Sequence, residues 1–136
     1  MTLRREFQWW VLVLLTLASV GLAACGVSAY TVEGGLPDRD PDLSYRLVTQ
    51  EHALVLDVRT PQEYQQGHLP TAKNIPINQL SDRLSDVAAL VGGDKLHPIV
   101  VYCQSGGRAA RAKRLLLQAG YTQVTNLGGL SDWPEK

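Results

Sequence analysis

The sequence predicts an α/β fold in which a mainly parallel sheet of about four or five strands lies between helices. Two observations lead to this prediction. Apolar runs at residues 53–58 and 98–103 have the composition of strands that are covered on both faces. Segments with helical spacing of apolar residues alternate with these runs, and the connections between them are short. This alternation is typical of parallel strands joined by helices that pack on the sheet.

The first half of the predicted domain contains, in chain order, a helix over residues 43–50, a strand over 53–58, a short helix between Thr60 and Gly67, and a strand over 72–75. The first helix is inferred from Leu43 and Leu47, which fall on one helical face. The second helix has a capping box at its start, because Thr60 can cap the helix and Glu63 follows three residues later. Pro61 suits the first helical position.

The second half contains, in chain order, a helix over residues 81–91, a strand over 98–103, a helix over 107–119 and a strand over 124–127. Apolar residues recur at helical spacing in both predicted helices, and glycine follows each of them. Trp133 is expected to pack against the domain near its C-terminal end.

Cys103 ends one of the predicted buried strands and is followed by a tight turn into a helix. The residues after it are, in order, Gln104, Ser105, Gly106, Gly107 and Arg108. Ligands of parallel α/β sheets bind beyond the carboxyl ends of the strands, which is where Cys103 falls. The first N–H groups of a helix have no partner within it, so such a turn forms an anion-binding cup.

A thiol inside that cup is expected to ionise readily. Lowering the pKa of a cysteine from about 8.5 by about two units requires ~2.7 kcal/mol of preference for the thiolate. Several backbone N–H groups that point at the sulfur, together with Arg108, can supply this preference for the thiolate. The competing interpretation, a small buried apolar cysteine, is weakened by the Gly-Gly-Arg turn behind it.

The stretch YCQSGGRAARAKRLLLQAGYTQVTNLGGLSDW resembles the active-site half of the rhodanese family, and LVLDVRTPQEYQQGHLPTAKNIPI is similar to its N-terminal signature half. The similarity covers about residues 43–133. Within the family, the chain resembles the periplasmic single-domain type linked to phage-shock operons. The resemblance implies a three-layer rhodanese-like domain over residues 43–136.

What the resemblance implies for function is a sulfurtransferase that needs no cofactor and no metal. The Cys103 thiolate would accept a sulfane sulfur from a donor such as thiosulfate and pass it, as a persulfide, to cyanide or a thiol. Arg108 would help to hold an anionic donor. Phosphatase and arsenate-reductase relatives have five residues between Cys and Arg, whereas only residues 104–107 intervene here, which argues against a phosphatase.

Two departures from the family pattern keep an alternative open. Gln104 stands where a basic residue is frequent, and Ala109 replaces a frequent Ser or Thr. Both changes weaken the attraction for a dianionic donor. The alternative is a low-turnover sulfur carrier, or a rhodanese module that acts through a protein partner.

Residues 1–24 are expected to be a signal peptide of the lipoprotein type, with Cys25 as the lipidated residue. At about 1.5 Å per residue, the uncharged run 9–24 spans about 24 Å as a helix, short of the ~30 Å hydrocarbon core. The sequence LAAC that ends at Cys25 resembles a bacterial lipobox. An uncleaved anchor and a conventional cleaved signal are the alternatives. All three predict export to the periplasm or cell envelope, and a lipid would attach the protein to the membrane.

Residues 25–42 are rich in Gly, Pro and Asp and predict a flexible tether between the membrane and the domain. The 13 basic residues balance the 13 acidic ones, so no nucleic-acid partner is indicated, and we expect a monomer.

Several polar residues of the domain are assigned structural roles. Asp57, Arg59 and Glu63 are expected to pair with one another, and His68 to be a turn residue. Lys113 is expected on the solvated side of its helix. With Cys25 acylated, Cys103 would be the only free thiol, so no disulfide within the chain is expected.

Overall fold

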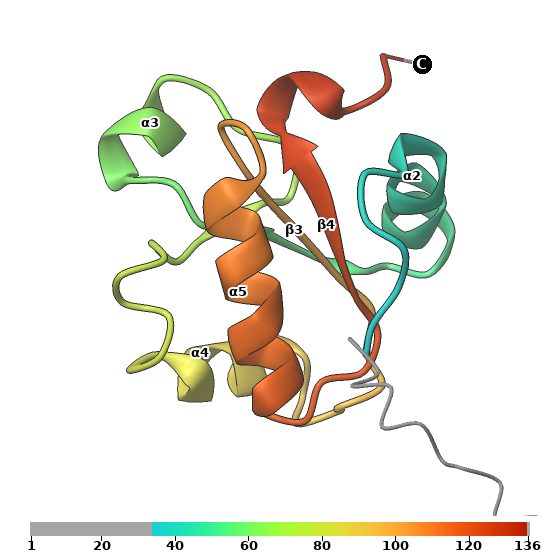
Figure 1. The fold of residues 1–136 in the computed structure, drawn as a ribbon, viewed down its shortest axis with the longest axis vertical. Coiled ribbons are helices and arrows are strands. Elements are labelled where there is room, and N and C mark those ends of the chain that lie inside the picture. Colours follow the sequence, from blue (N-terminus) through green and yellow to red (C-terminus); the bar gives the residue numbers. More distant parts are fainter. Residues whose placement is uncertain (1–33, 136) are drawn as a thin grey trace, which may run out of the picture. The chain divides into compact units, whose positions relative to one another are not determined.

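The structure, a computed structural model, describes residues 34–135 and confirms the α/β class (Figure 1). The elements are, in chain order, α2 (Pro41–Gln50), β1 (Leu54–Asp57), α3 (Pro61–Gln65), β2 (Lys73–Asn74), α4 (Leu84–Leu90), β3 (Ile99–Cys103), α5 (Gly107–Gln118), β4 (Val124–Gly129) and the 3₁₀ turn η1 (Leu130–Asp132). The predicted order of helices and strands is therefore correct.

The four strands form one parallel sheet in the order β2-β1-β3-β4. Because all strands run the same way, their carboxyl ends meet at one edge of the sheet. Cys103 lies at that edge, paired with Gly129 of β4, and Asp57 at the end of β1 is paired with Tyr102. The strand ends therefore bring together the residues that the sequence singled out.

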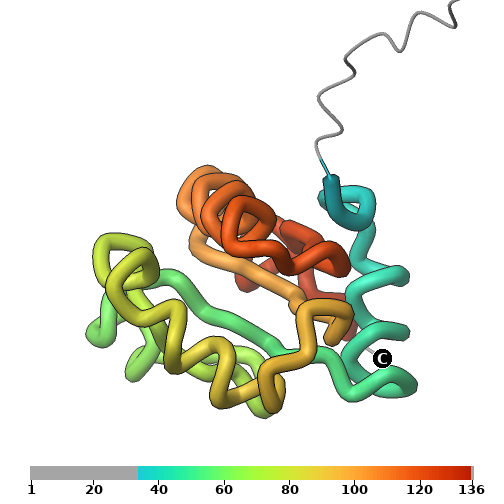
Figure 2. The backbone as a smooth tube through the Cα atoms, turned by 90° about the horizontal axis from the view of Figure 1, so that it is seen from below, coloured from blue at the N-terminus to red at the C-terminus, as the bar shows by residue number. Residues whose placement is uncertain are grey.

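Helices cover both faces of the sheet, giving three layers. Side chains of a strand alternate between the two faces, so Val101 and Cys103 join the apolar cluster beneath α4 and α5. Val100 and Tyr102 join the cluster beneath α2. Figure 2 shows α4 and α5 on one side of the strands and α2 on the other. This alternation places the Cys103 side chain under the start of α5.

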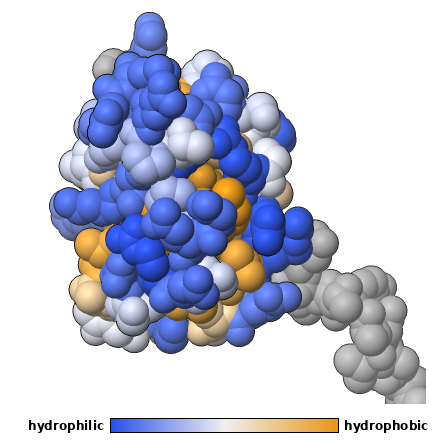
Figure 3. Space-filling model, turned by 90° about the vertical axis from the view of Figure 1, so that its left-hand side faces the viewer, coloured by the Kyte–Doolittle hydropathy of each residue, from blue (hydrophilic) through white to orange (hydrophobic). Residues whose placement is uncertain are grey.

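Most large apolar side chains lie inside these two clusters. Among residues 34–135, the exposed large apolar side chains are Leu90 and Leu96. Figure 3, which views the side that carries α3 and α4, shows a mainly hydrophilic surface interrupted by small apolar areas.

The predicted helix over 81–91 begins later than expected. Residues 76–83 form successive turns, in which the Gln79 N–H donates to the Pro76 carbonyl at 2.8 Å and the Asp82 N–H to the Gln79 carbonyl at 3.1 Å. Helix α4 therefore starts only at Leu84. The last strand, in contrast, runs to Gly129, because its end pairs with the end of β3.

The predicted tether over 25–42 is wrong for its last part, and the domain begins before residue 43. The Leu36 N–H donates to the Val124 carbonyl at 2.9 Å, and the Arg39 N–H donates to the Asn126 carbonyl at 2.8 Å. Asp40 then caps helix α2. We call residues 36–40 the strap, because this segment runs along β4 and is hydrogen-bonded to it.

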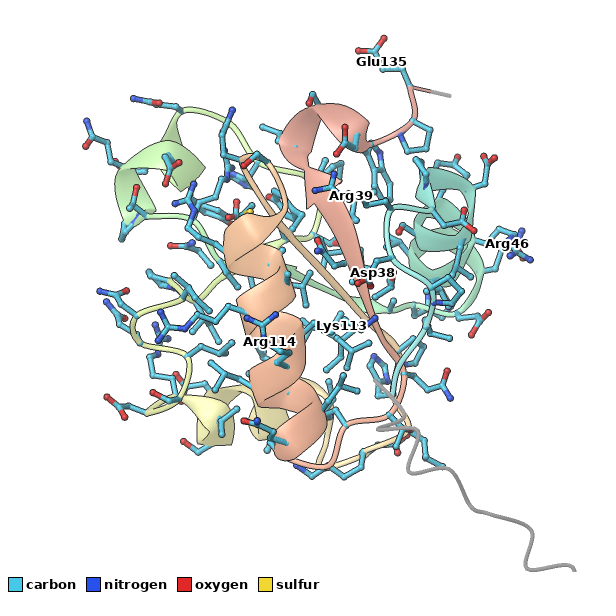
Figure 4. The ribbon with its side chains drawn as sticks, viewed as in Figure 1. Asp38, Arg39, Arg46, Lys113, Arg114 and Glu135 are labelled. Carbon is cyan, nitrogen blue, oxygen red and sulfur yellow. The ribbon has the colours of Figure 1, made fainter. Side chains whose placement is uncertain are left out.

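The expectation that Lys113 lies on the solvated side of its helix is wrong, because Lys113 is buried. Its ammonium group, which Figure 4 shows beside the strap, binds the Asp38 carboxylate at 2.6 Å and the Leu36 carbonyl at 2.7 Å. Helix α5 and the strap are thus joined by a charged contact. The composition of residues 34–40 hid this, since Gly, Pro and Asp also dominate flexible segments.

The signal peptide over 1–24, the lipidated Cys25 and the first part of the predicted tether lie outside the described residues. Within residues 34–135, no helix has the length and apolar character needed to cross a membrane.

Candidate active site

Cys103 lies at the carboxyl end of β3, where the chain turns into α5. Its side chain is 1% exposed, and its Sγ accepts a hydrogen bond of 3.0 Å from the Gly106 N–H. Gly106 has φ +95°, a left-handed conformation that residues with a Cβ atom rarely adopt. This glycine lets the turn fold back over the sulfur and start helix α5 at Gly107.

The backbone of the turn favours the ionised sulfur. Burial raises the pKa of the Cys103 thiol, but backbone N–H groups lower it by more, so the pKa lies below its ordinary value. The residues that supply these N–H groups are, from the largest effect to the smallest, Ala109, Ser105, Gly106 and Arg108. The first turn of α5 therefore acts as the anion-binding end of a helix.

Glycines in β4 allow the turn to lie close to the sheet. A Cβ atom at Gly129 would collide with the Gln104 backbone oxygen, and Gly128 has φ +112°. The side chains of Gln104 and Ser105 are exposed at the mouth of the site. We call the six residues from Cys103 to Arg108, which surround the buried sulfur, the cup.

Arg108 is paired with Glu63 and is not a free cation. Its two terminal nitrogens donate to the two Glu63 oxygens, each at 2.7 Å. The hydrogen bond to Glu63 is the main cause of the raised pKa of Arg108, and the nearby Cys103 sulfur adds to it. Arg108 therefore lies near the sulfur, and the Glu63 carboxylate offsets part of its charge. That Arg108 helps to hold an anionic donor stays a prediction.

Glu63 is held for this contact by the start of α3. Its Oε2 accepts hydrogen bonds from the Thr60 N–H at 2.8 Å and the Thr60 hydroxyl at 2.9 Å, which completes the predicted capping box. The hydrogen bond from Arg108 and the capping contacts lower the pKa of Glu63 to about 2. The cap of a short helix thus fixes the position of Arg108.

Asp57 and Arg59 form a separate, buried pair below this one. The Arg59 Nη2 donates to the Asp57 Oδ2 at 2.7 Å and to the Gly67 carbonyl at 2.6 Å. The predicted pairing is correct for these two residues and wrong for Glu63. The pair fixes the segment between β1 and α3, and with it the direction from which Glu63 approaches the cup.

His68 lies within its own turn. Its ring stacks on Tyr64 with centroids 3.8 Å apart, and its Nδ1 is 2.9 Å from the Tyr64 carbonyl oxygen. These contacts agree with a structural role. Within the part of the chain that the structure describes, no group of three or more His, Cys, Asp or Glu side chains is placed to hold a metal ion.

Two residues that the sequence did not single out bind the outer side of the cup. The Asn126 amide donates to the Gly106 carbonyl at 3.1 Å, and the Arg39 guanidinium donates to the Ser105 carbonyl at 3.0 Å. A polar Asn in a buried strand was a signal for Asn126. Arg39 carried no such signal, because it lies in a stretch without periodicity.

The chain also matches a known protein family over the part that contains this site. The rhodanese-like domain family matches residues 40–136, which include the whole cup and the sheet around it. The chain belongs to the rhodanese family.

This rhodanese is similar to two proteins that are named as sulfurtransferases. It is 40% identical over 77 residues to the thiosulfate sulfurtransferase PspE of Escherichia coli, a match that covers 57% of this chain and 70% of that protein. It is 39% identical over 92 residues to a sulfurtransferase of Allochromatium vinosum, covering 67% and 80%. The solved structure described as a rhodanese with anions from E. coli has 40% identity and a TM-score of 0.54, covering 60% of this chain and 94% of that one.

The pH dependence of folding tests the pair between Arg108 and Glu63. The folded-state pKa of Glu63 is lowered from 4.5 to about 2, so its contribution to stability is present above about pH 4.5 and is lost as the pH falls towards 2. We expect Glu63→Gln to lower the free energy of unfolding by roughly 1–2 kcal/mol near neutral pH. The difference from the wild type should shrink as the pH approaches about 2.

Urea unfolding at a series of pH values measures this difference. Glu135→Gln is the matched control, because Glu135 is exposed near the C-terminus (Figure 4) and its substitution should change stability by less than ~0.5 kcal/mol. A Glu63→Gln variant that is as stable as the wild type near neutral pH would contradict the assignment.

Proposed function

We propose that this protein is a sulfurtransferase that carries sulfane sulfur on Cys103, from a donor such as thiosulfate to an acceptor such as cyanide or a thiol. The observation that carries the proposal is the Cys103 sulfur inside a ring of backbone N–H groups. Membership of the rhodanese family and relatives named as sulfurtransferases support it.

The reaction has two steps that restore the enzyme. In the first step, the Cys103 thiolate attacks the outer sulfur of thiosulfate. A bond between Sγ and that sulfur forms, the original sulfur–sulfur bond breaks, and sulfite leaves with the electron pair. In the second step, cyanide attacks the outer sulfur of the persulfide, the bond to Sγ breaks, and thiocyanate leaves. The thiolate is regenerated, and no cofactor takes part.

The cup assists both steps through charge stabilisation. The thiolate before transfer and the persulfide after transfer are both anions, and both lie at the positive end of α5. Its N–H groups are fixed by the fold and need no rearrangement when charge moves from one sulfur to the next. The Arg108–Glu63 pair lies beside the cup and holds the first turn of α5 in place.

Three features of the site favour a second candidate, a sulfur carrier that serves a specific protein acceptor. The charge of Arg108 is offset by Glu63, Gln104 is neutral and Ala109 has no hydroxyl group. Offsetting the charge of Arg108 weakens the attraction of the site for a small dianion such as thiosulfate. Such a protein would load sulfur on Cys103 but release it slowly to cyanide.

Replacing Cys103 by Ser tests both candidates. The wild type should release thiocyanate from thiosulfate and cyanide, and Cys103→Ser should show no enzymatic release, because a hydroxyl cannot carry sulfane sulfur. Mass spectrometry after exposure to thiosulfate should show one added sulfur atom on Cys103.

The outcomes separate the candidates. Loading with rapid thiocyanate release supports the enzyme, and loading with very slow release supports the carrier. Equal thiocyanate release by wild type and Cys103→Ser, or no added sulfur on wild-type Cys103, would exclude both.

We further propose that the protein is exported and attached to the membrane of the cell envelope by a lipid on Cys25. The support comes from the sequence LAAC that ends at Cys25 and from the uncharged run before it. Residues 26–35 would then lie between the lipidated residue and the strap. In this arrangement each cysteine has one role, because acylation removes Cys25 as a disulfide partner for Cys103.

Cys25→Ser provides the matched test, since it makes the same change at the other cysteine. We expect the wild type to have the intact mass of a chain that begins at a lipidated Cys25 and to fractionate with membranes. Cys25→Ser should lose the lipid and still transfer sulfur. A wild-type mass without lipid would contradict this proposal and would leave the role of Cys103 unaffected.

A further inference from the structure

A single peptide group connects the strap to the reactive sulfur. The Ser105 carbonyl accepts a hydrogen bond of 3.0 Å from the Arg39 Nη2, and the N–H of the same peptide, on Gly106, donates to Cys103 Sγ at 3.0 Å. A peptide group is planar, with its C=O and N–H pointing in opposite directions. Fixing the carbonyl from outside therefore also fixes the direction in which the N–H points.

The backbone around Arg39 is fixed by contacts of the strap with β4 and α5. Its N–H donates to the Asn126 carbonyl at 2.8 Å. The neighbouring Asp38 carboxylate binds Lys113 at 2.6 Å and the Asn126 N–H at 2.9 Å. Arg39 adopts φ +55°, an uncommon conformation for a residue with a side chain, and such conformations persist where surrounding contacts determine them.

Two glycines make room for the Arg39 guanidinium against the cup. A Cβ atom at Gly106 would lie 2.7 Å from the Arg39 Nη2, and one at Gly128 would lie 3.4 Å from its Nη1. Both glycines have positive φ, so their backbone conformations also disfavour a side chain. Figure 4 shows Arg39 beside the end of β4, near the turn that leads into α5.

Arg39 and Arg108 also differ in whether a carboxylate neutralises their charge. Arg108 is paired with Glu63, whereas Arg39 forms no ion pair with any carboxylate of residues 34–135. A cation that donates to a carbonyl polarises the whole peptide group and strengthens the hydrogen bond that its N–H makes on the other side.

We propose that Arg39 is a positioning residue for sulfur transfer, which binds the Ser105 carbonyl and thereby aims the Gly106 N–H at the sulfur of Cys103. This inference rests on the proposed use of Cys103 as the sulfur carrier. It assigns the strap, which is bound to β4 and α5, a direct effect on the reactivity of the site.

Loss of Arg39 should make the thiolate less stable. The charged groups around the cup are Arg108 from α5, its partner Glu63 from α3, Asp132 from η1, which accepts from the Gly129 N–H, and Arg39 from the strap. Removing Arg39 takes away one positive charge and frees one of the peptide groups that stabilise the anion. Both effects raise the pH at which Cys103 ionises.

The experiment compares Arg39→Ala, Arg39→Gln and Arg39→Lys with the wild type in the full-length protein. Alkylation of Cys103 by iodoacetamide is measured across a pH series, since only the thiolate reacts. Arg46→Ala is the matched control, because Arg46 is an exposed arginine of α2 that points away from the site (Figure 4). Sulfur loading from thiosulfate and the unfolding temperature are recorded for each variant.

We expect Arg39→Ala to raise the midpoint of the alkylation profile by roughly one pH unit, corresponding to loss of about one charge-assisted hydrogen bond. Arg39→Lys should restore part of the shift by keeping the charge. Arg39→Gln should lie between Lys and Ala, since it keeps a donor without the charge. Arg46→Ala should match the wild type.

An unchanged midpoint in all three Arg39 variants would overturn the proposal. If Arg39→Ala does not fold, the Lys and Gln variants decide, and equal wild-type midpoints for both would overturn it. A merely structural role predicts lower unfolding temperatures without a shift of the midpoint. Failure of the wild type to load sulfur would contradict the proposed function, a result that does not depend on Arg39.

Discussion

The whole site depends on the turn after Cys103, which points several backbone N–H groups at the sulfur, among them the Gly106 N–H at 3.0 Å. The sulfur is buried, which by itself disfavours its anion. The turn reverses this balance, because it points backbone N–H groups at the sulfur. The N–H groups in the first turn of α5 have no hydrogen-bond partner within the helix and can therefore stabilise the anion. Sulfur transfer needs an anion at this place both before and after the sulfur moves.

The rest of the domain keeps the turn in position. From one side, the capped start of α3 presents Glu63 to Arg108 in the first turn of α5. From the other side, β4 and the strap bind carbonyl groups of the turn through Asn126 and Arg39. These contacts fix the carbonyl groups on the outer side of the turn, and the N–H groups on its inner side therefore point at the sulfur. Glu63 also offsets the charge of Arg108, which weakens the attraction of that arginine for small anionic donors.

The sequence was sufficient for the fold class, the order of elements and the position of the turn that leads from Cys103 into a helix. Buried parallel strands are continuous apolar runs, and a Cys-to-Arg turn before a helix is a local pattern. Contacts between segments far apart in sequence were missed. The Glu63–Arg108 pair joins residues 45 positions apart, and the contact of Arg39 with Ser105 spans 66 positions. The strap was mistaken for a tether because its order comes from β4 and Lys113, which composition does not show.

Titration of the Cys103 thiol shows whether the turn stabilises the thiolate. The ultraviolet absorbance of the thiolate is followed against pH, with Cys103→Ser as the blank. We expect a midpoint below the value of about 8.5 for free cysteine, because the backbone N–H groups outweigh burial. A midpoint at or above that value would mean that burial prevails, and the turn would then not stabilise the anion on which sulfur transfer depends.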